Sequence, residues 1–166
     1  MTRIPNSVSA ESPTPALARE RRQVRAAATL LRLALGSIAL AHGLLKVFVF
    51  TLPGTVAFFV DHGYPGALAY LVTAAEVAGG LGLLAGVLVR WASLGLVPVF
   101  AGAALTVAPN GWLFDSPGGG GWEFPGLLVL AALVQALLGP GAWALGPALA
   151  RRVRRVAPTS LATARA

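Results

Sequence analysis

The residues of this chain that are best suited to chemistry are a histidine and a lysine inside an apolar stretch. The segment AHGLLK, residues 41–46, places His42 and Lys46 four positions apart, about one helical turn. Glu76 lies in a second apolar stretch, residues 67–89. An imidazole, an ammonium and a carboxylate together could bind a polar ligand or move protons. A buried Lys–Glu pair could equally fix the register of two helices, and the sequence leaves both interpretations open.

The stretches that carry these residues are long enough to cross a membrane. The chain has 166 residues, of which 56% are hydrophobic and 11% charged, whereas a soluble domain carries about 25% charged residues. We predict an all-α fold, an integral membrane four-helix bundle. Its domain covers residues 27–146, with spans at about residues 27–50, 67–89, 92–108 and 125–144.

Basic tails flank this predicted domain. Residues 1–26 contain several prolines and arginines and are predicted to be a disordered cytoplasmic tail, and residues 147–166 to be a second basic cytoplasmic tail. Loops 51–66 and 109–124 contain no Lys or Arg, whereas Arg90 lies in the loop between the second and third spans. The positive-inside rule therefore predicts that both termini are cytoplasmic. The net charge of +7 does not indicate nucleic-acid binding, because the basic residues cluster in the two tails and one short loop beside the apolar segments.

The depth of each polar residue follows from the helix rise. His42 comes out about 12 Å below the outer end of its span, Glu76 about 13 Å and Gln135 about 15 Å. Lys46 lies about 6 Å down, one turn above His42. We therefore expect a polar cluster of His42, Lys46 and Glu76 in the outer half of the membrane, with Glu76 accepting a hydrogen bond from Lys46 or His42. Gln135 alone is better explained as a contact between helices.

Other polar residues could support this cluster. Tyr70 and Thr73 precede Glu76 at intervals of three, on one helix face. Arg32 comes out near the inner interface, where its side chain could extend to water. The chain has no cysteine and only two histidines, His42 and His62. No metal site is predicted, and iron–sulfur ligation by thiolates is excluded.

The order of several short motifs resembles the DoxX family of four-span bacterial and archaeal membrane proteins. The segments are LLRLALGSIALAHGLLKVF, AYLVTAAEVAGGLGLLAGVLVR, LTVAPNGWLF, GGWEFP and LLGPG, between about residues 30 and 145. The positions that match the family pattern are Arg32, His42, Gly43, Lys46, Glu76, Gly79, Gly80, Asn110, Gly111, Glu123, Gly139, Pro140 and Gly141. Asn110 and Glu123 enter the set of candidate supporting residues through this match alone.

The resemblance implies a role in membrane redox chemistry. It suggests a small subunit of an oxidoreductase complex in the bacterial plasma (inner) membrane, with soluble or membrane oxidoreductase partners and quinone as the candidate cofactor. Whether the chain is itself an enzyme stays open. One alternative is a non-catalytic membrane anchor or assembly partner. Another is a small-solute transporter, for which four spans would need a homo-oligomer.

Overall fold

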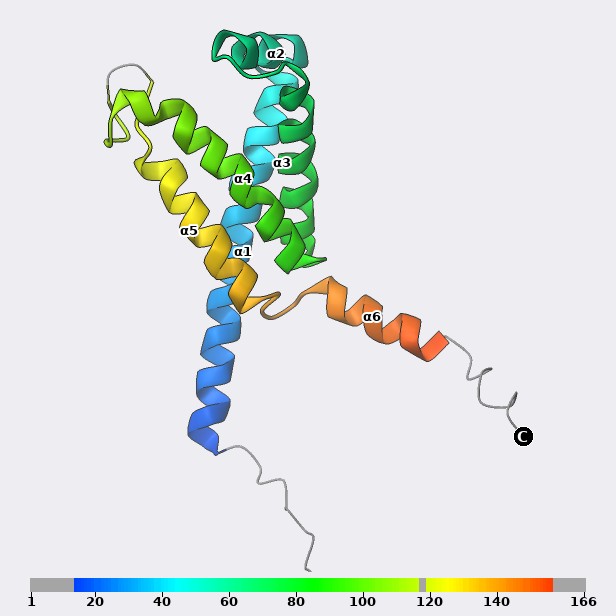
Figure 1. Cartoon of the computed structure of the whole chain (residues 1–166). Coiled ribbons are helices and arrows are strands. Elements are labelled where there is room, and N and C mark those ends of the chain that lie inside the picture. Colours follow the sequence, from blue (N-terminus) through cyan, green and yellow to red (C-terminus); the bar gives the residue numbers. More distant parts are fainter. Residues whose placement is uncertain (1–13, 117–118, 157–166) are drawn as a thin grey trace, which may run out of the picture.

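The computed structural model describes residues 14–116 and 119–156, and within these ranges the chain forms helices and no strands. Helix α1, Pro15–Phe48, has 34 residues and is the longest element (Figure 1). Its length of about 51 Å exceeds the roughly 30 Å hydrocarbon core of a bilayer. Residues 15–26, predicted as part of a disordered tail, are helical instead, because this stretch is rich in Ala, Leu, Arg and Glu and has no glycine.

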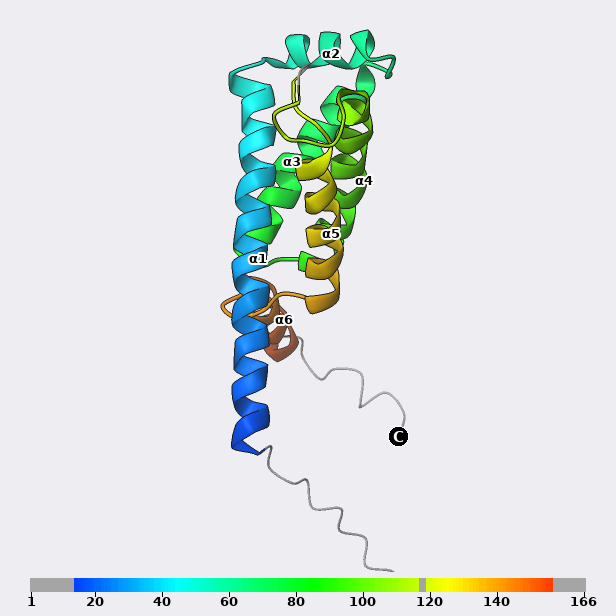
Figure 2. The same ribbon diagram turned by 90° about the vertical axis from the view of Figure 1, so that its left-hand side faces the viewer.

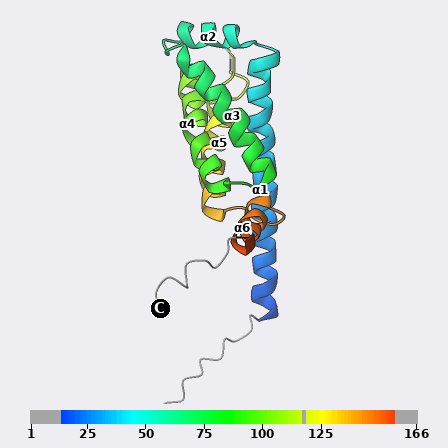
Figure 3. The same cartoon turned by 90° about the vertical axis from the view of Figure 1, so that its right-hand side faces the viewer.

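Three further helices complete the bundle: α3, Ala67–Ala85, α4, Val89–Val107, and α5, Glu123–Leu138 (Figures 2 and 3). The short helix η1, Ala108–Asn110, continues α4. By length and composition α1, α3 and the α4–η1 unit can cross a membrane, whereas α5 has only 16 residues. A rise of about 24 Å still allows α5 to cross a locally thinned bilayer. The four-helix membrane bundle is thus confirmed.

Helix α2, Leu52–Asp61, lies across the end of the bundle where α1 ends and α3 begins (Figures 1 and 2). Thr51 caps it, since its hydroxyl accepts a hydrogen bond of 3.3 Å from the Gly54 amide. The Thr55 hydroxyl donates to the carbonyl oxygens of Thr51, at 2.9 Å, and Lys46, at 3.3 Å. These bonds fix α2 to the end of α1.

Helices α1 and α3 pack through glycines. A Cβ atom added at Gly80 would lie 2.7 Å from the backbone nitrogen of Leu40, and one at Gly43 would lie 2.7 Å from the Val77 side chain. Small residues let membrane helices approach closely, and this contact sets the position of the site described below. Gly86 follows α3 in a left-handed conformation, with φ of +69°, and ends the helix.

The hydrophobic core lies between α1, α3, α4 and α5. It is formed by buried side chains that contact one another, among them Leu35, Leu83, Leu96, Phe100 and Leu128. Helix α6, Leu145–Val156, follows a turn at the end of α5 and leaves the bundle sideways (Figure 1). Part of the predicted C-terminal tail is therefore helical, and residues 157–166 lie outside the described ranges.

Candidate functional site

The centre of the candidate site is an ion pair between α1 and α3. The Lys46 ammonium donates to both carboxylate oxygens of Glu76, at 2.8 Å to Oε1 and 2.7 Å to Oε2. Lys46 lies in the last turn of α1, and Glu76 lies in the middle of α3. The glycine contact between the helices, one turn from each residue, brings the two charges together. The sequence left open whether Lys46 or His42 donates a hydrogen bond to Glu76, and in the structure the donor is Lys46.

The two charged side chains differ in their exposure. Glu76 is 6% exposed and Lys46 is 18% exposed. In an apolar medium either charge alone is costly, so each one stabilises the other. The remaining exposed part of the lysine leaves room for an additional contact, which a fully enclosed structural pair would not have.

His42 lies beside this pair, one turn earlier on α1. Its Nδ1 is 2.9 Å from the carbonyl oxygen of Ile38, and the imidazole is exposed at the surface of the helix bundle. A hydrogen bond with that carbonyl requires the proton on Nδ1, which leaves Nε2 as an acceptor in the neutral ring. His42 therefore holds a fixed orientation through the backbone of its own helix, and it adds a proton-accepting nitrogen to the site.

His42, Lys46 and Glu76 together line a cavity of about 270 Å³. The opposite walls come from α4, through Val99 and Phe100, and from the start of α5, through Phe124 and Leu128. Polar groups on one side and apolar or aromatic groups on the other are typical of small-molecule sites. The predicted cluster is therefore brought together, and it faces a cavity.

The loop between η1 and α5 covers this cavity. Phe114 and the glycines 119–121 contribute to its wall, and the Phe114 and Phe124 rings pack edge to face with centroids 6.0 Å apart. The Asn110 side-chain amide donates to the Gly120 carbonyl at 3.0 Å. Glu123 accepts a hydrogen bond from the Phe114 amide at 3.2 Å. These two predicted residues thus hold the cover in place and do not line the cavity.

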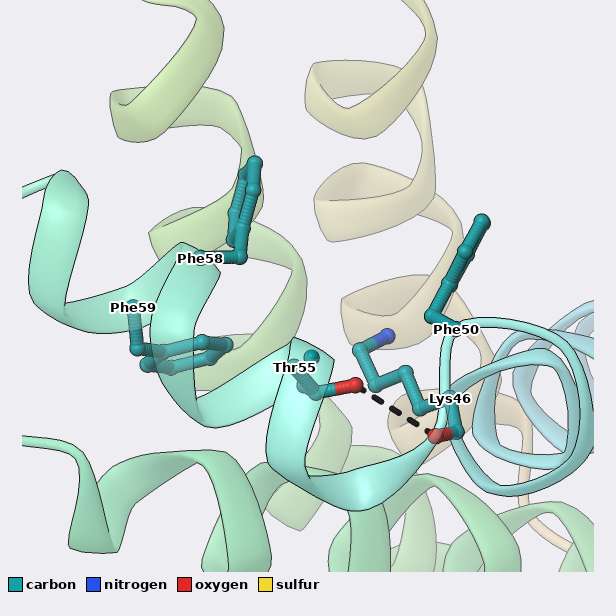
Figure 4. Close-up of a pocket in the computed structure, with 6 residues that line it drawn as sticks. Lys46, Phe50, Thr55, Phe58 and Phe59 are labelled. Carbon is teal, nitrogen blue, oxygen red and sulfur yellow. Dashed lines mark hydrogen bonds between the residues drawn. The ribbon is translucent and has the colours of Figure 1, made fainter.

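A second cavity, of about 510 Å³, lies between the end of α1 and α2 (Figure 4). Its lining is apolar except for Lys46 and Thr55, and the aromatic side chains are Phe50, Phe58 and Phe59. Lys46 lines both cavities. This cavity could not be predicted from the sequence, because phenylalanines near a span end are equally suited to contact lipid.

The remaining supporting candidates lie elsewhere. Tyr70 is 54% exposed, and the buried hydroxyl of Thr73 donates to the Ala69 carbonyl of its own helix at 2.7 Å. Gln135 is fully buried in the last turn of α5, where its amide donates to the Gly139 carbonyl at 2.7 Å. It lies seven residues, about 10 Å, further inward than Leu128 of the cavity wall. The depth estimate for Gln135 counted from residue 125 as the start of this span, whereas α5 begins at Glu123, which puts Gln135 about 18 Å from the start of its helix.

Arg32 also differs from its predicted surroundings. It was expected to extend to water, but it is 2% exposed, and its guanidinium packs against Gly86 at the end of α3. Arg32 lies one turn inward of the core residue Leu35 and does not line either cavity. Among the described residues, no cluster of three or more His, Cys, Asp or Glu side chains could hold a metal ion.

These features define a small helical membrane protein with a charged, partly enclosed site between its helices. The family model for DoxX matches residues 27–109. The chain is also similar to the protein named "Putative oxidoreductase CatD" from Bacillus subtilis (strain 168), with 34% identity over 118 residues. That alignment covers 71% of this chain and 83% of the relative. The chain belongs to the DoxX family. No solved structure matches it.

Proposed function

We propose that this protein is a membrane subunit of an oxidoreductase complex that binds a quinone head group in the cavity lined by His42, Lys46 and Glu76. The observation that carries the proposal is that the ion pair faces a cavity of about 270 Å³. This volume is near the lower end for small-molecule sites, and it suits a ring-sized head group better than an entire lipid. The family and the name of the Bacillus relative support an oxidoreductase system.

The polar side of the cavity matches the chemistry of a quinone. The carbonyl oxygens of a quinone accept hydrogen bonds, which the ammonium of Lys46 can donate. Reduction to the quinol takes up electrons and protons in equal number. Glu76 and His42 are positioned to exchange protons with the ring oxygens, as general acids and bases do. The electrons would come from a flavin- or metal-containing partner protein, because this chain has no cysteine to supply a thiol couple.

The apolar side of the cavity matches the ring. Phe100, Phe114 and Phe124 present aromatic surface to the space opposite the charged pair. A flat aromatic ligand gains both burial and offset or edge contacts with such side chains. We place the site in the outer half of a bacterial plasma membrane, with both termini cytoplasmic, because the tails carry the arginines.

The test is quinone binding to the purified protein in lipid nanodiscs. Ala103 on α4 lines the cavity, and Ala103→Phe would fill it without replacing any member of the charged cluster. Leu105→Phe on the same helix is the matched control, because Leu105 is 70% exposed and does not line the cavity. We expect Ala103→Phe to weaken binding at least about tenfold, or 1.4 kcal/mol, and Leu105→Phe to leave it unchanged. Equal binding by both variants, or no quinone bound by the wild type, contradicts the proposal.

One observation favours a second role as an assembly partner. The N-terminal part of α1 extends beyond the bundle, and Arg19, Arg21, Arg22 and Arg25 on it are exposed (Figure 1). This rigid basic surface could dock an acidic cytoplasmic protein. Affinity purification of the wild type and of a variant with Arg19, Arg21 and Arg22 changed to Gln tests this role. Loss of the same partner from the variant at an unchanged protein level supports it, and an identical set of partners contradicts it.

A further inference from the structure

Helix α6 has a defined starting point at the end of the bundle. The Thr29 hydroxyl on α1 accepts a hydrogen bond from the Ala142 amide at 2.7 Å; its own proton is within reach of the Arg25 carbonyl, at 2.9 Å, and of the Ala142 carbonyl, at 3.1 Å. The Gly146 amide then donates to the Gly86 carbonyl at 3.1 Å. Hydrogen bonds to α1 and to the end of α3 therefore fix the turn that leads into α6, and they set the depth at which α6 begins.

We infer that this depth is the membrane boundary. Gly86 lies in the short turn between α3 and α4, two consecutive spans, and such a turn is placed where the hydrocarbon ends. From this level α6 runs sideways, away from the bundle axis, and among the described residues no other helix lies along it (Figure 1). A helix that leaves a bundle in this direction runs along the membrane surface.

The described side chains of α6 are apolar and basic at different positions around the helix. Leu145 and Leu149 are four residues apart, hence on one face, and they are 55% and 53% exposed. Trp143, just before the helix, is 84% exposed. Arg151 is exposed and lies two positions after Leu149, about 200° further around the helix. The sequence has four arginines between residues 151 and 155.

We propose that α6 is an interfacial helix that lies in the plane of the membrane and binds anionic phospholipids. Leu145 and Leu149 enter the boundary between head groups and acyl chains, Trp143 lies at the head-group level, and Arg151 contacts lipid phosphates. The membrane is favoured over an acidic protein because the helix begins at the bilayer boundary and carries exposed leucines beside its charges. Each arginine near an anionic surface adds attraction that falls off within a Debye length.

Because the chain has no cysteine, a single cysteine can be introduced at a chosen position and labelled specifically. The variants Leu149→Cys and Arg151→Cys, each carrying a nitroxide label, are reconstituted in vesicles of phosphatidylcholine with phosphatidylglycerol. The accessibility of each label to oxygen and to a water-soluble nickel chelate reports its depth. Labels at Leu137→Cys on α5, where the native residue is 80% exposed, and at Arg19→Cys on the extended part of α1 provide the lipid and water references.

The expected result is an oxygen-to-nickel ratio several-fold higher at position 149 than at position 151. The difference should shrink in vesicles of phosphatidylcholine alone and at high salt. Equal, water-like accessibility at both positions in the anionic vesicles would overturn the proposal. Shielding of position 149 that appears only in native membranes, and not in pure lipid, would also overturn it, and would indicate a protein partner instead.

Discussion

Lys46 and Glu76 form a two-pronged ion pair that joins the last turn of α1 to the middle of α3, with both N–O distances below 3 Å. It is the only Lys/Arg–Asp/Glu pair among the residues that the structure describes. The pair lies at the edge of a glycine-mediated helix contact and on the wall of the cavity of about 270 Å³, and Lys46 also lines the second cavity. The same two side chains are thus positioned both to stabilise the bundle and to contact a ligand.

The stability of the ion pair can be separated from its chemistry by a double-mutant cycle. We expect Glu76→Gln or Lys46→Met alone to lower the free energy of unfolding by about 3 kcal/mol, because each leaves a buried polar partner uncompensated. The double variant should recover most of this loss, since no unpaired charge remains. Denaturation in mixed micelles, followed by circular dichroism, measures all three variants. Additive losses in the double variant would show that the two residues are not energetically coupled.

Because α1 and α3 are in close contact, we expect a single methyl group added between them to lower stability strongly. Gly80→Ala would place its Cβ 2.7 Å from the backbone of Leu40, so the two helices must separate. We expect a loss of about 1–3 kcal/mol, the usual cost of overpacking. Gly95→Ala on α4 is the matched control, because an added Cβ there meets no atom within 4 Å. The control should be neutral or stabilising, since alanine favours helices more than glycine does. Equal effects at both positions would argue against a tight α1–α3 contact.

The cover of the candidate site should affect ligand binding without affecting the ion pair. Asn110→Ala removes the hydrogen bond to Gly120 that holds the loop over the cavity. We expect quinone to bind about fivefold more weakly, corresponding to about 1 kcal/mol for one hydrogen bond. Asp115→Asn, at an exposed position in the same loop, serves as the control. A quinone titration in nanodiscs checks both, and an unchanged affinity in Asn110→Ala would show that the loop does not contribute to binding.

Two buried threonines make different hydrogen bonds, and we therefore expect their replacement by valine to lower stability by different amounts. Thr29 is 4% exposed and links α1 to Ala142, whereas Thr73 is 5% exposed and its hydroxyl donates to a carbonyl of its own helix. Thr29→Val should lower stability by about 1–3 kcal/mol, because it leaves buried backbone groups without a partner. It should also accelerate amide exchange at Ala142 and Gly146. Thr73→Val should cost less and leave that exchange unchanged. Faster exchange in both variants would mean that Thr29 does not hold the turn before α6.

Properties that depend on the residues of a single segment could be predicted from the sequence. Hydrophobic runs and their lengths depend on the residues of one segment, so the four-helix membrane bundle could be predicted from the sequence and is confirmed. His42, Lys46 and Glu76 could be grouped for a similar reason: two share a helix turn, and the third lies at a matching depth from its own span end. Their use in quinone binding stays a prediction.

Other features depend on contacts between segments. Gln135 and Arg32 were placed by counting residues along single spans, and the count for Gln135 began at residue 125, whereas α5 begins at Glu123. Arg32 is buried because the backbone turn at Gly86 leaves room for its guanidinium, a packing detail that no single segment contains. The cavity walls and the cover held by Asn110 likewise come from four separate parts of the chain.

The sequence by itself therefore determined the class of fold, the number of spans and the residues able to carry charge within them, because hydropathy and helix rise are properties of one segment. The tertiary structure alone decided that Lys46 pairs with Glu76, that a cavity lies beside the pair, and that α6 leaves the bundle beside the turn between α3 and α4. Those outcomes depend on how closely α1 and α3 approach through Gly43 and Gly80, which is set by side-chain packing between helices distant in the chain.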